Sequence, residues 1–335
     1  MTSEAARLGA NGLPRFEDLP LRKQDPPYSA WGLYGPKDEL GTLNRLTDEN
    51  VVAAARAEIQ TGRRFCLDHP MGLESKMNFF HRAKFHQQIV RAPEPIMCND
   101  DIWTFNSQSG SQWDGLRHFA YQKEAQFYNG ITMRDIHEPD AQGQRSICNG
   151  IHAFSERGIV GRGILLDYHE WRLKQTSLRP FSPLQSDEIS LAELKQVAQD
   201  QGTKIQFGDI LLVRSGFTQA VQHGDPAVVD TYRTAPDPAF CGVEQTEDVL
   251  RWIWENLSAV AGDHPTFEVW PETALDYKLH EILLSGWGMP IGELFNLEVL
   301  AAHGKEVGRY SFFISSEPCR VVGGIASPPN ILAIF

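Results

Sequence analysis

Hydrophobic and polar residues alternate along the chain in blocks that predict helices interleaved with strands. The clearest helix lies at residues 190–202, where Ser190 and Glu193 form a capping box and Gly202 closes the end. Caps and apolar residues that share one face predict further helices at residues 47–62, 246–257 and 273–286.

Short apolar runs bounded by glycine or polar residues predict strands between these helices. The predicted strands lie within residues 63–71, 161–171, 204–217, 258–268, 309–315 and 319–325. No repeat of 20–50 residues is present, so a solenoid or propeller is not expected. Because helices do not follow every strand, we predict an α/β fold with a mixed central sheet.

The first part of the chain differs from the rest in composition. Residues 1–40 are rich in proline, glycine and charge, as in the stretch LPLRKQDPPYSAWGLYGPKDELG. This composition predicts an extended N-terminal arm that wraps either its own domain or a partner subunit. Residues 41–335 contain no obvious linker after about residue 45 and are expected to form a single domain.

Composition and charge narrow the classes of partner. The chain has 335 residues, 41% of them hydrophobic, and a formal net charge of −12. An acidic chain is a poor ligand for nucleic acid or for an anionic membrane surface, since both need clustered Lys and Arg. No run of 18 apolar residues predicts a membrane span, and no signal peptide is recognised. The five scattered cysteines suggest reduced thiols, so we expect a cytoplasmic protein.

Residues 107–119, SQSGSQWDGLRHF, fit neither an amphipathic helix nor a strand. In an extended chain Gln108 and Gln112 would lie about 13 Å apart at about 3.3 Å per residue, too far to share one ion. The chain must therefore turn between them, and Gly110 supplies the conformational freedom. Gln112 and Asp114 are two residues apart, so an extended segment points both to the same side. The spacing predicts side chains that converge on one point.

This stretch resembles the H-x-G-T-H-x-D-x-P-x-H motif of the Putative cyclase family, which includes bacterial kynurenine formamidase and isatin hydrolase. Gly110, Asp114 and His118 match the glycine, the aspartate and the last histidine of the motif. Gln108 and Gln112 stand where the motif has its two metal-binding histidines. A serine also replaces the threonine, and a leucine replaces the proline. The active-site segment is therefore the part that departs from the family.

Further matches follow in the order of the family, so that the resemblance covers about residues 40–325. The matching segments lie at residues 162–168, 207–217, 260–268 and 279–297. The last of them resembles H-x-x-L-L-x-x-G-I-P-I-x-E-N-L and carries His280 and Glu293, with one extra residue between them. The resemblance implies a swivelling β/β/α fold, a homo-oligomer, and hydrolysis of an amide or a cyclic amide by metal-activated water.

The resemblance also implies which residues form the site. The family's metal ligands and proton-transfer groups correspond here to Gln108, Gln112, Asp114, His118, His280 and Glu293. By position, the metal set is Gln108, Gln112 and Asp114. An amide offers a harder ligand than imidazole, which suits Mn²⁺ or Mg²⁺ better than Zn²⁺. Trp113, Tyr121 and Trp287 lie beside these segments and are predicted to form an aromatic wall for the substrate.

Three hypotheses for function stay open from the sequence. The first is a hydrolase or cyclase that acts on a small cyclic or aromatic amide or lactone with a bound Mn, Mg or Zn ion. The second needs no cofactor: a lyase, dehydratase or isomerase would use His118, Asp114, His280 and Glu293 for acid–base catalysis, with the glutamine amides as oxyanion donors. The third is a non-catalytic small-molecule-binding protein. Outside these residues, Asp263 and His264 follow a strand and fit a site or a plain turn equally well, and Glu268 is a weaker candidate.

Overall fold

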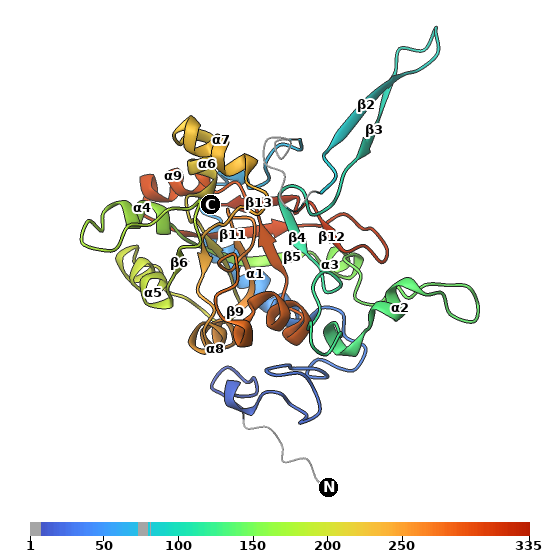
Figure 1. Ribbon diagram of the computed structural model, residues 1–335, viewed down its shortest axis with the longest axis horizontal. Helices are drawn as coiled ribbons and strands as arrows, with labels where there is room; N and C mark the ends of the chain where they lie inside the picture. The colour runs from blue at the N-terminus through green and yellow to red at the C-terminus, as the bar shows by residue number, and fades with distance from the viewer. Residues whose placement is uncertain (1–7, 73–79, 81) are drawn as a thin grey trace.

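A large mixed sheet forms the centre of the molecule, and helices and long loops pack around it (Figure 1). The computed structural model describes residues 8–72, 80 and 82–335 of the chain. The predicted α/β fold with a mixed central sheet is confirmed.

The strands of the central sheet are β1 (Arg64–Cys66), β4 (Gln112–Asp114), β5 (Ile159–Leu166), β7 (Asp209–Val213), β9 (Leu257–Gly262), β10 (Ile291–Glu293), β11 (Ser311–Ser316), β12 (Ala326–Ser327) and β13 (Ile331–Ile334). Two smaller pairs are formed by β2 (His86–Arg91) with β3 (Asn99–Thr104) and by β6 (Glu188–Ile189) with β8 (Gly242–Val243). The α-helices are α1 (Asp48–Glu58), α2 (Met133–His137), α3 (His152–Arg157), α4 (Tyr168–Leu173), α5 (Leu191–Asp200), α6 (Phe217–His223), α7 (Pro226–Thr234), α8 (Glu247–Asn256) and α9 (Glu298–Val307).

The order of strands in the central sheet is β1-β13-β11-β5-β7-β9-β10-β4-β12. The four strands β5, β7, β9 and β10 run parallel, and the strands on either side of them pair antiparallel. All five residues of β7, DILLV, are buried, as expected for a parallel strand that is covered on both faces. This arrangement places β4, which carries the motif, beside β10, which carries Glu293.

Local capping signals explain the helices that the sequence predicts. Helix α5 has the Ser190–Glu193 capping box, α1 is capped by Thr47 and α8 is capped by Thr246. The helix predicted at residues 273–286 is not α-helical. A short 3-10 turn is followed by a π-helix, Glu281–Trp287. The carbonyl groups of Ser285 and Gly286 also accept hydrogen bonds from the N-terminal arm.

One predicted strand is wrong. Residues 319–325 form a loop, and the strand β12 begins only after it. The backbone turns at Gly323, whose φ is +71°, and the amide of Gly324 donates to the carbonyl of Val321. A chain that bonds to itself in this way cannot continue a strand ladder.

The described part of the N-terminal arm, residues 8–40, lies against its own domain (Figure 1). Trp254 Nε1 donates to the carbonyl of Pro14 at 2.9 Å, and Trp287 Nε1 donates to the carbonyl of Tyr28 at 2.8 Å. Trp31 Nε1 donates to the carbonyl of Ser285 at 2.7 Å. The indoles of Trp254 and Trp287 thus satisfy backbone carbonyls of the arm, and the indole of Trp31 in the arm satisfies a carbonyl of the body.

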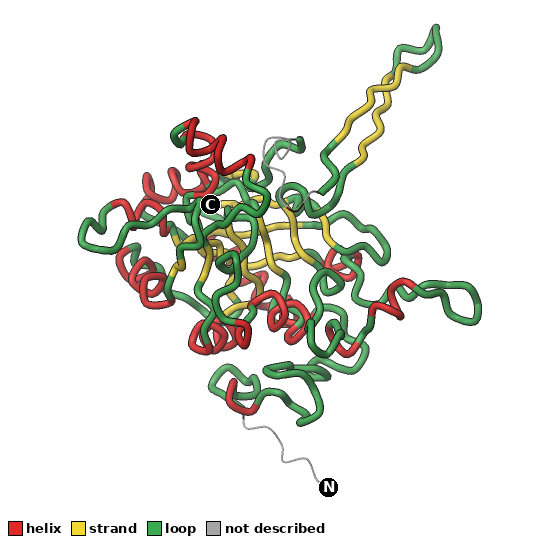
Figure 2. The backbone as a smooth tube through the Cα atoms, in the orientation of Figure 1, coloured by secondary structure: helices red, strands yellow, loops and turns green. Residues whose placement is uncertain are grey.

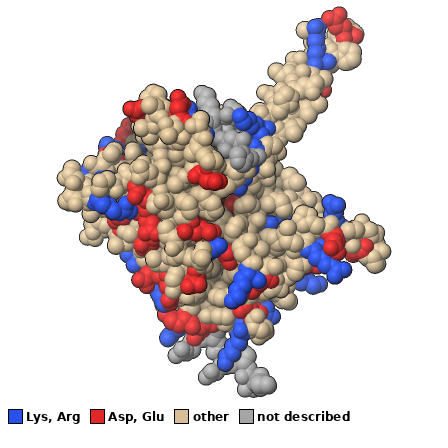
Figure 3. All heavy atoms as spheres, in the orientation of Figure 1, with Lys and Arg blue, Asp and Glu red and all other residues tan. Residues whose placement is uncertain are grey.

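Strands β2 and β3 form a long hairpin that projects from the body of the molecule (Figures 1 and 2). Every residue of β3 is exposed, and so is nearly all of β2. Apolar side chains on it include Ile89, which is 70% exposed, and Trp103, which is 56% exposed. On the face shown in Figure 3 the stem of the hairpin is almost free of charged side chains, which gather at its tip. Within the described residues, no helix has the length and hydropathy needed to cross a bilayer.

Candidate functional site

The pairing of β4 with β10 brings the motif residues next to Glu293. The two strands are antiparallel, and their register sets Gln112 directly opposite Glu293. Gln112 Nε2 donates to Glu293 Oε2 at 2.6 Å. Because side chains alternate along a strand, Gln112 and Asp114 face the site while Trp113 faces the other way.

The loop before β4 folds back, so that Gln108 returns to the same point. Gln108 Nε2 donates to Asp114 Oδ1 at 2.6 Å, and Gln112 Nε2 donates to Gln108 Oε1 at 2.7 Å. Ser111 Oγ fixes the loop by donating to the carbonyl of Leu294 at 2.5 Å. The structure therefore brings together the two amides and the carboxylate, as the spacing of the motif predicts.

His280 lies at the start of the π-helix and contacts three carboxyl groups. Its Nδ1 is 2.8 Å from Glu268 Oε2, and its backbone amide donates to Glu268 Oε1 at 3.0 Å. Its Nε2 is 3.0 Å from Glu293 Oε1 and 3.6 Å from Asp114 Oδ2. A carboxylate on one ring nitrogen fixes the orientation of the imidazole and directs the other nitrogen to the site.

His118 completes the group from the loop that follows β4. Its Nε2 is 3.8 Å from Asp114 Oδ2, and its ring centroid is 6.2 Å from that of His280. The four residues predicted to act in catalysis, Asp114, His118, His280 and Glu293, are therefore neighbours in the structure. Their catalytic roles stay predictions.

Burial and mutual contact give these groups unusual pKa values. Burial would lower the pKa of His280, but the surrounding carboxylates outweigh it and raise that pKa well above its usual value. Burial would raise the pKa of Asp114, yet the imidazoles of His118 and His280 and the amide of Gln108 hold it low. Burial, together with the charge of Asp114, raises the pKa of Glu293 to about 7. Burial lowers the pKa of His118, which favours its neutral form at neutral pH.

A cavity of about 330 Å³ opens onto this cluster. Its polar side is formed by His118, His280, Glu268 and Glu293, and Phe119 and Trp270 form an apolar side. Phe119 lies with its ring centroid 5.6 Å from that of His280, edge to face. The cavity is large enough for a small aromatic or bicyclic molecule and is lined as small-molecule sites commonly are, with few polar groups among aromatic ones.

The cluster also offers the ligands for a metal ion. Asp114, His118 and His280 each place one donor atom within 4.8 Å of the others. In the described part of the chain, the buried Oδ2 of Asp114 has no hydrogen-bond partner, as expected for an oxygen that serves a cation. Of the metal set predicted from sequence position, Asp114 is in this group, and the predicted role of Gln108 and Gln112 as ligands stays a prediction. Gln108 and Gln112 instead donate hydrogen bonds to the carboxylates of Asp114 and Glu293.

The aromatic residues predicted to contact the substrate lie elsewhere. Trp113 is fully buried on the far side of β4, where its Nε1 donates to Ser316 Oγ. Tyr121 and Trp287 are buried against the N-terminal arm, and each donates to one of its backbone carbonyls. None of the three lines the cavity, so their placement gives no support for a contact with substrate. Phe119, which directly follows His118, and Trp270 take that position.

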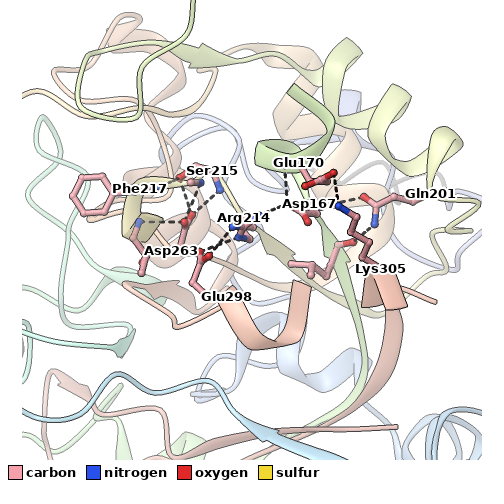
Figure 4. Close-up of polar contacts among 12 residues, drawn as sticks. Asp167, Glu170, Gln201, Arg214, Ser215, Phe217, Asp263, Glu298 and Lys305 are labelled. Atoms are coloured by element: carbon pink, nitrogen blue, oxygen red, sulfur yellow. Dashed lines mark hydrogen bonds and ion pairs between the residues drawn. The ribbon is translucent and has the colours of Figure 1, made fainter. Parts of the chain in front are cut away.

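Glu268 is the site residue that sequence reasoning undervalued. It sits six residues beyond the end of β9 and reaches His280 through a loop. The stronger candidate nearby, Asp263, has a structural role: it accepts hydrogen bonds from the amide and hydroxyl of Ser215 at 2.6 and 2.7 Å (Figure 4). Asp263 and Glu268 both lie beyond the end of β9, and nothing in the local sequence identifies which of them meets His280.

Comparisons with known proteins point to one family and one fold. The model of the Putative cyclase family matches residues 49–269. A crystal structure described as a novel cyclase is similar at 28% sequence identity with a TM-score of 0.78, and the match covers 92% of this chain and 99% of that one. No curated protein matches the sequence.

More distant structures share the fold. Isatin hydrolase A from Ralstonia solanacearum has a TM-score of 0.55 at 15% identity, with 86% of this chain and 98% of that chain covered. Isatin hydrolase A from Labrenzia aggregata, bound to benzyl benzoate, has a TM-score of 0.54 at 15% identity, with 87% and 98% covered. The family model spans well over half of the chain and includes Gln108, Gln112, Asp114, His118 and Glu268, whereas His280 and Glu293 lie beyond its last matched residue. The chain therefore belongs to the Putative cyclase family.

Proposed function

We propose that this protein hydrolyses, or closes in the reverse direction, the ring or amide bond of a small cyclic or aromatic amide or lactone. The observation that carries the proposal is the cluster of Asp114, His118, His280 and Glu293 at the polar side of a cavity with aromatic walls. Solved structures of the same fold are described as isatin hydrolases, one of them with an aromatic ester bound, which supports an aromatic carbonyl compound as substrate.

Asp114, His118 and His280 would hold a divalent metal ion, and its binding would displace the proton that the surrounding carboxylates favour on His280. Two imidazole nitrogens and one carboxylate oxygen suit Zn²⁺ or Mn²⁺ better than Mg²⁺. When bound, such an ion supplies a Lewis acid for the substrate carbonyl and acidifies a water molecule. Glu268 holds the ring of His280 with Nε2 toward the site, which is the usual outer-shell arrangement of a metal-binding histidine.

Other side chains of the site would transfer protons or hold the substrate and the carboxylates in place. Glu293, with a pKa of about 7, can both accept and return a proton at its Oε1 atom near neutral pH. Both hydrogens of the Gln112 amide are used, one by Gln108 and one by Glu293, so Gln112 is better suited to hold a carboxylate in place than to serve as an oxyanion donor. Phe119 and Trp270 would bind the flat part of the substrate and exclude water from one side.

Activity with and without metal separates the three hypotheses. Purified protein is assayed against a panel of lactams, lactones and aryl formamides, first as isolated, then after chelation, then with Zn²⁺, Mn²⁺ or Mg²⁺ restored. We expect chelation to lower kcat/KM by about 100-fold and Zn²⁺ or Mn²⁺ to restore it. A rate of turnover that the chelator does not change would favour the metal-independent lyase or isomerase. Ligand binding without turnover on any panel member would favour a binding protein.

We further propose that the protein forms a homo-oligomer in the cytoplasm and that the β2–β3 hairpin contacts a second copy. A two-stranded hairpin has marginal stability alone, and this one presents apolar side chains along a stem that is almost free of charged side chains on the face shown in Figure 3. The described part of the N-terminal arm contacts its own domain, so the hairpin is the better candidate for the subunit contact. The free cysteines, four of them exposed, fit a reducing compartment.

A charge placed on the hairpin tests the oligomer. We expect light scattering to show a dimer or larger assembly for the unchanged protein, and Trp103→Glu to weaken that assembly at least about tenfold in its dissociation constant. Leu275→Glu is the matched control, since Leu275 is 72% exposed on the body of the molecule. A wild-type protein that stays monomeric at micromolar concentration would exclude the proposed contact.

A further inference from the structure

Arg82 is a cation at the wall of the site cavity, and among the described residues its guanidinium makes one hydrogen bond. It precedes the hairpin in sequence and lines the cavity together with His118 and Glu293. Its Nη1 donates to the carbonyl of Gln108 at 2.5 Å, and its guanidinium lies 4.9 Å from the ring centroid of Phe80. A guanidinium carries five N–H donors, so one bond to a carbonyl leaves most of them for another acceptor.

The carboxyl groups of the cavity are engaged by other partners. Glu268 and Glu293 contact His280 at 2.8 and 3.0 Å, and Glu272 is 3.3 Å from the ammonium of Lys278. Across residues 8–72, 80 and 82–335, no carboxylate oxygen lies within 4.0 Å of the Arg82 guanidinium. Arg82 is half-buried beside a ligand cavity, forms no close ion pair among the described residues, and acts on the charge of Glu293 only at longer range. Its guanidinium is therefore suited to bind the carboxylate of a ligand in two-point fashion.

The hydrogen bond to Gln108 fixes Arg82 relative to the reacting groups. Gln108 donates through its side chain to Asp114, and its backbone carbonyl accepts from Arg82. The guanidinium and the catalytic carboxylate are thus held by the same residue. A substrate anchored on Arg82 would meet the cluster at a fixed distance, which is how positioning groups raise the rate of a reaction.

We propose that the cavity binds an aromatic carboxylate: its ring packs on Phe119 and Trp270, its carboxylate pairs with Arg82, and its amide or lactone carbonyl faces His118, His280 and Asp114. The position of the reacting carbonyl in this assignment rests on the proposed function. The binding of the carboxylate rests on Arg82 alone. Arg82 is a specificity-determining residue in this assignment, and the substrate class narrows to aromatic acids that carry the reactive group on the same ring system.

Binding of two fluorescent probes of nearly equal shape tests the subsite without requiring turnover. 2-Aminobenzoate carries the carboxylate, and 2-aminobenzamide replaces it by a neutral amide. We expect the wild-type protein to bind 2-aminobenzoate at least about tenfold more tightly than 2-aminobenzamide. In Arg82→Gln the dissociation constants of the two probes should lie within about twofold of each other. Arg82→Lys should show a preference between those of the wild type and Arg82→Gln. Raising the salt concentration from 50 to 500 mM should reduce the preference.

Controls separate the subsite from the metal and from folding. Arg91→Gln is the matched variant, since Arg91 lies on the hairpin and pairs with Glu94 at the surface, and it should keep the wild-type preference. All titrations are repeated after chelation, because a carboxylate could also bind a metal ion. Equal binding of both probes by the wild type, a preference that survives Arg82→Gln, or a preference lost on chelation would each overturn the assignment. Arg82→Gln retains a side-chain donor for Gln108, and a thermal midpoint within about 2 °C of the wild type shows that the variant is folded.

Hydrolysis of 2-(formylamino)benzoate and of formanilide, measured in parallel, distinguishes this inference from the proposed function. If neither is cleaved while the Arg82-dependent binding preference holds, the proposed reaction fails and the anion subsite stands. If both are cleaved at equal kcat/KM in wild type and Arg82→Gln, the reaction stands and the subsite is wrong.

Discussion

Replacing Asp114 by asparagine is expected to lower kcat/KM by about 1,000-fold and to abolish tight binding of Zn²⁺ or Mn²⁺. The Oδ2 atom of Asp114 is 3.8 Å from His118 Nε2 and 3.6 Å from His280 Nε2. It therefore joins the two imidazoles into one donor set, and asparagine removes the only carboxylate of that set. An Asn can still accept the hydrogen bond from Gln108, so the loop should keep its conformation.

Kinetics and metal titration of Asp114→Asn are measured beside Asp230→Asn. Asp230 is largely exposed and pairs only loosely with Arg233, at 3.8 Å, so its variant should keep activity and metal affinity. Turnover by Asp114→Asn within threefold of the wild type would mean that the cluster is not the reaction site.

Replacing Arg214 by methionine is expected to lower the free energy of unfolding by about 3–5 kcal/mol. Arg214 follows β7 and lies between Asp167 and Glu298, with N–O distances of 2.8 and 2.6 Å (Figure 4). The side chain of Arg214 is only 9% exposed and that of Asp167 only 4%. Loss of the guanidinium leaves the buried carboxylate of Asp167 without its ion-pair partner, which costs more than the ion pair itself contributes.

Urea unfolding of Arg214→Met is compared with that of Arg134→Met. Arg134 pairs with Glu138 at 2.9 Å, but its side chain is 82% exposed, and such pairs contribute about 1 kcal/mol or less. The double variant Arg214→Met/Asp167→Asn should recover part of the loss, because the stranded charge is removed. A loss below about 1 kcal/mol in the single variant would show that solvent reaches this network.

Much of the fold follows from local sequence. Thr47, Ser190 and Thr246 begin helices because their side chains accept hydrogen bonds from backbone amides three residues on. The buried strands β5, β7 and β9 follow from uninterrupted apolar runs. The projecting β2–β3 hairpin has no such signal, because its strands bury neither face and carry no alternation of apolar and polar residues.

The site was only partly accessible to the same reasoning. The spacing of Gln108, Gln112 and Asp114 predicts their convergence, which the loop and β4 produce. Glu268 and Arg82 reach the cluster through tertiary contacts that no local pattern encodes. The aromatic wall was predicted by proximity in sequence, and proximity in sequence is a poor guide on a strand. Since Trp113 stands between Gln112 and Asp114, the two-residue period of a strand places it on the opposite face.

The π-helix Glu281–Trp287 lies between His280 and Glu293 and affects how many residues can separate these two side chains. A π-turn takes up one residue more than an α-turn. The sequence has one more residue between His280 and Glu293 than the family motif that it resembles, and the π-turn takes up one residue of this kind. The chain can thus accommodate an insertion between these two side chains inside one widened turn, and their approach to 3.0 Å is preserved.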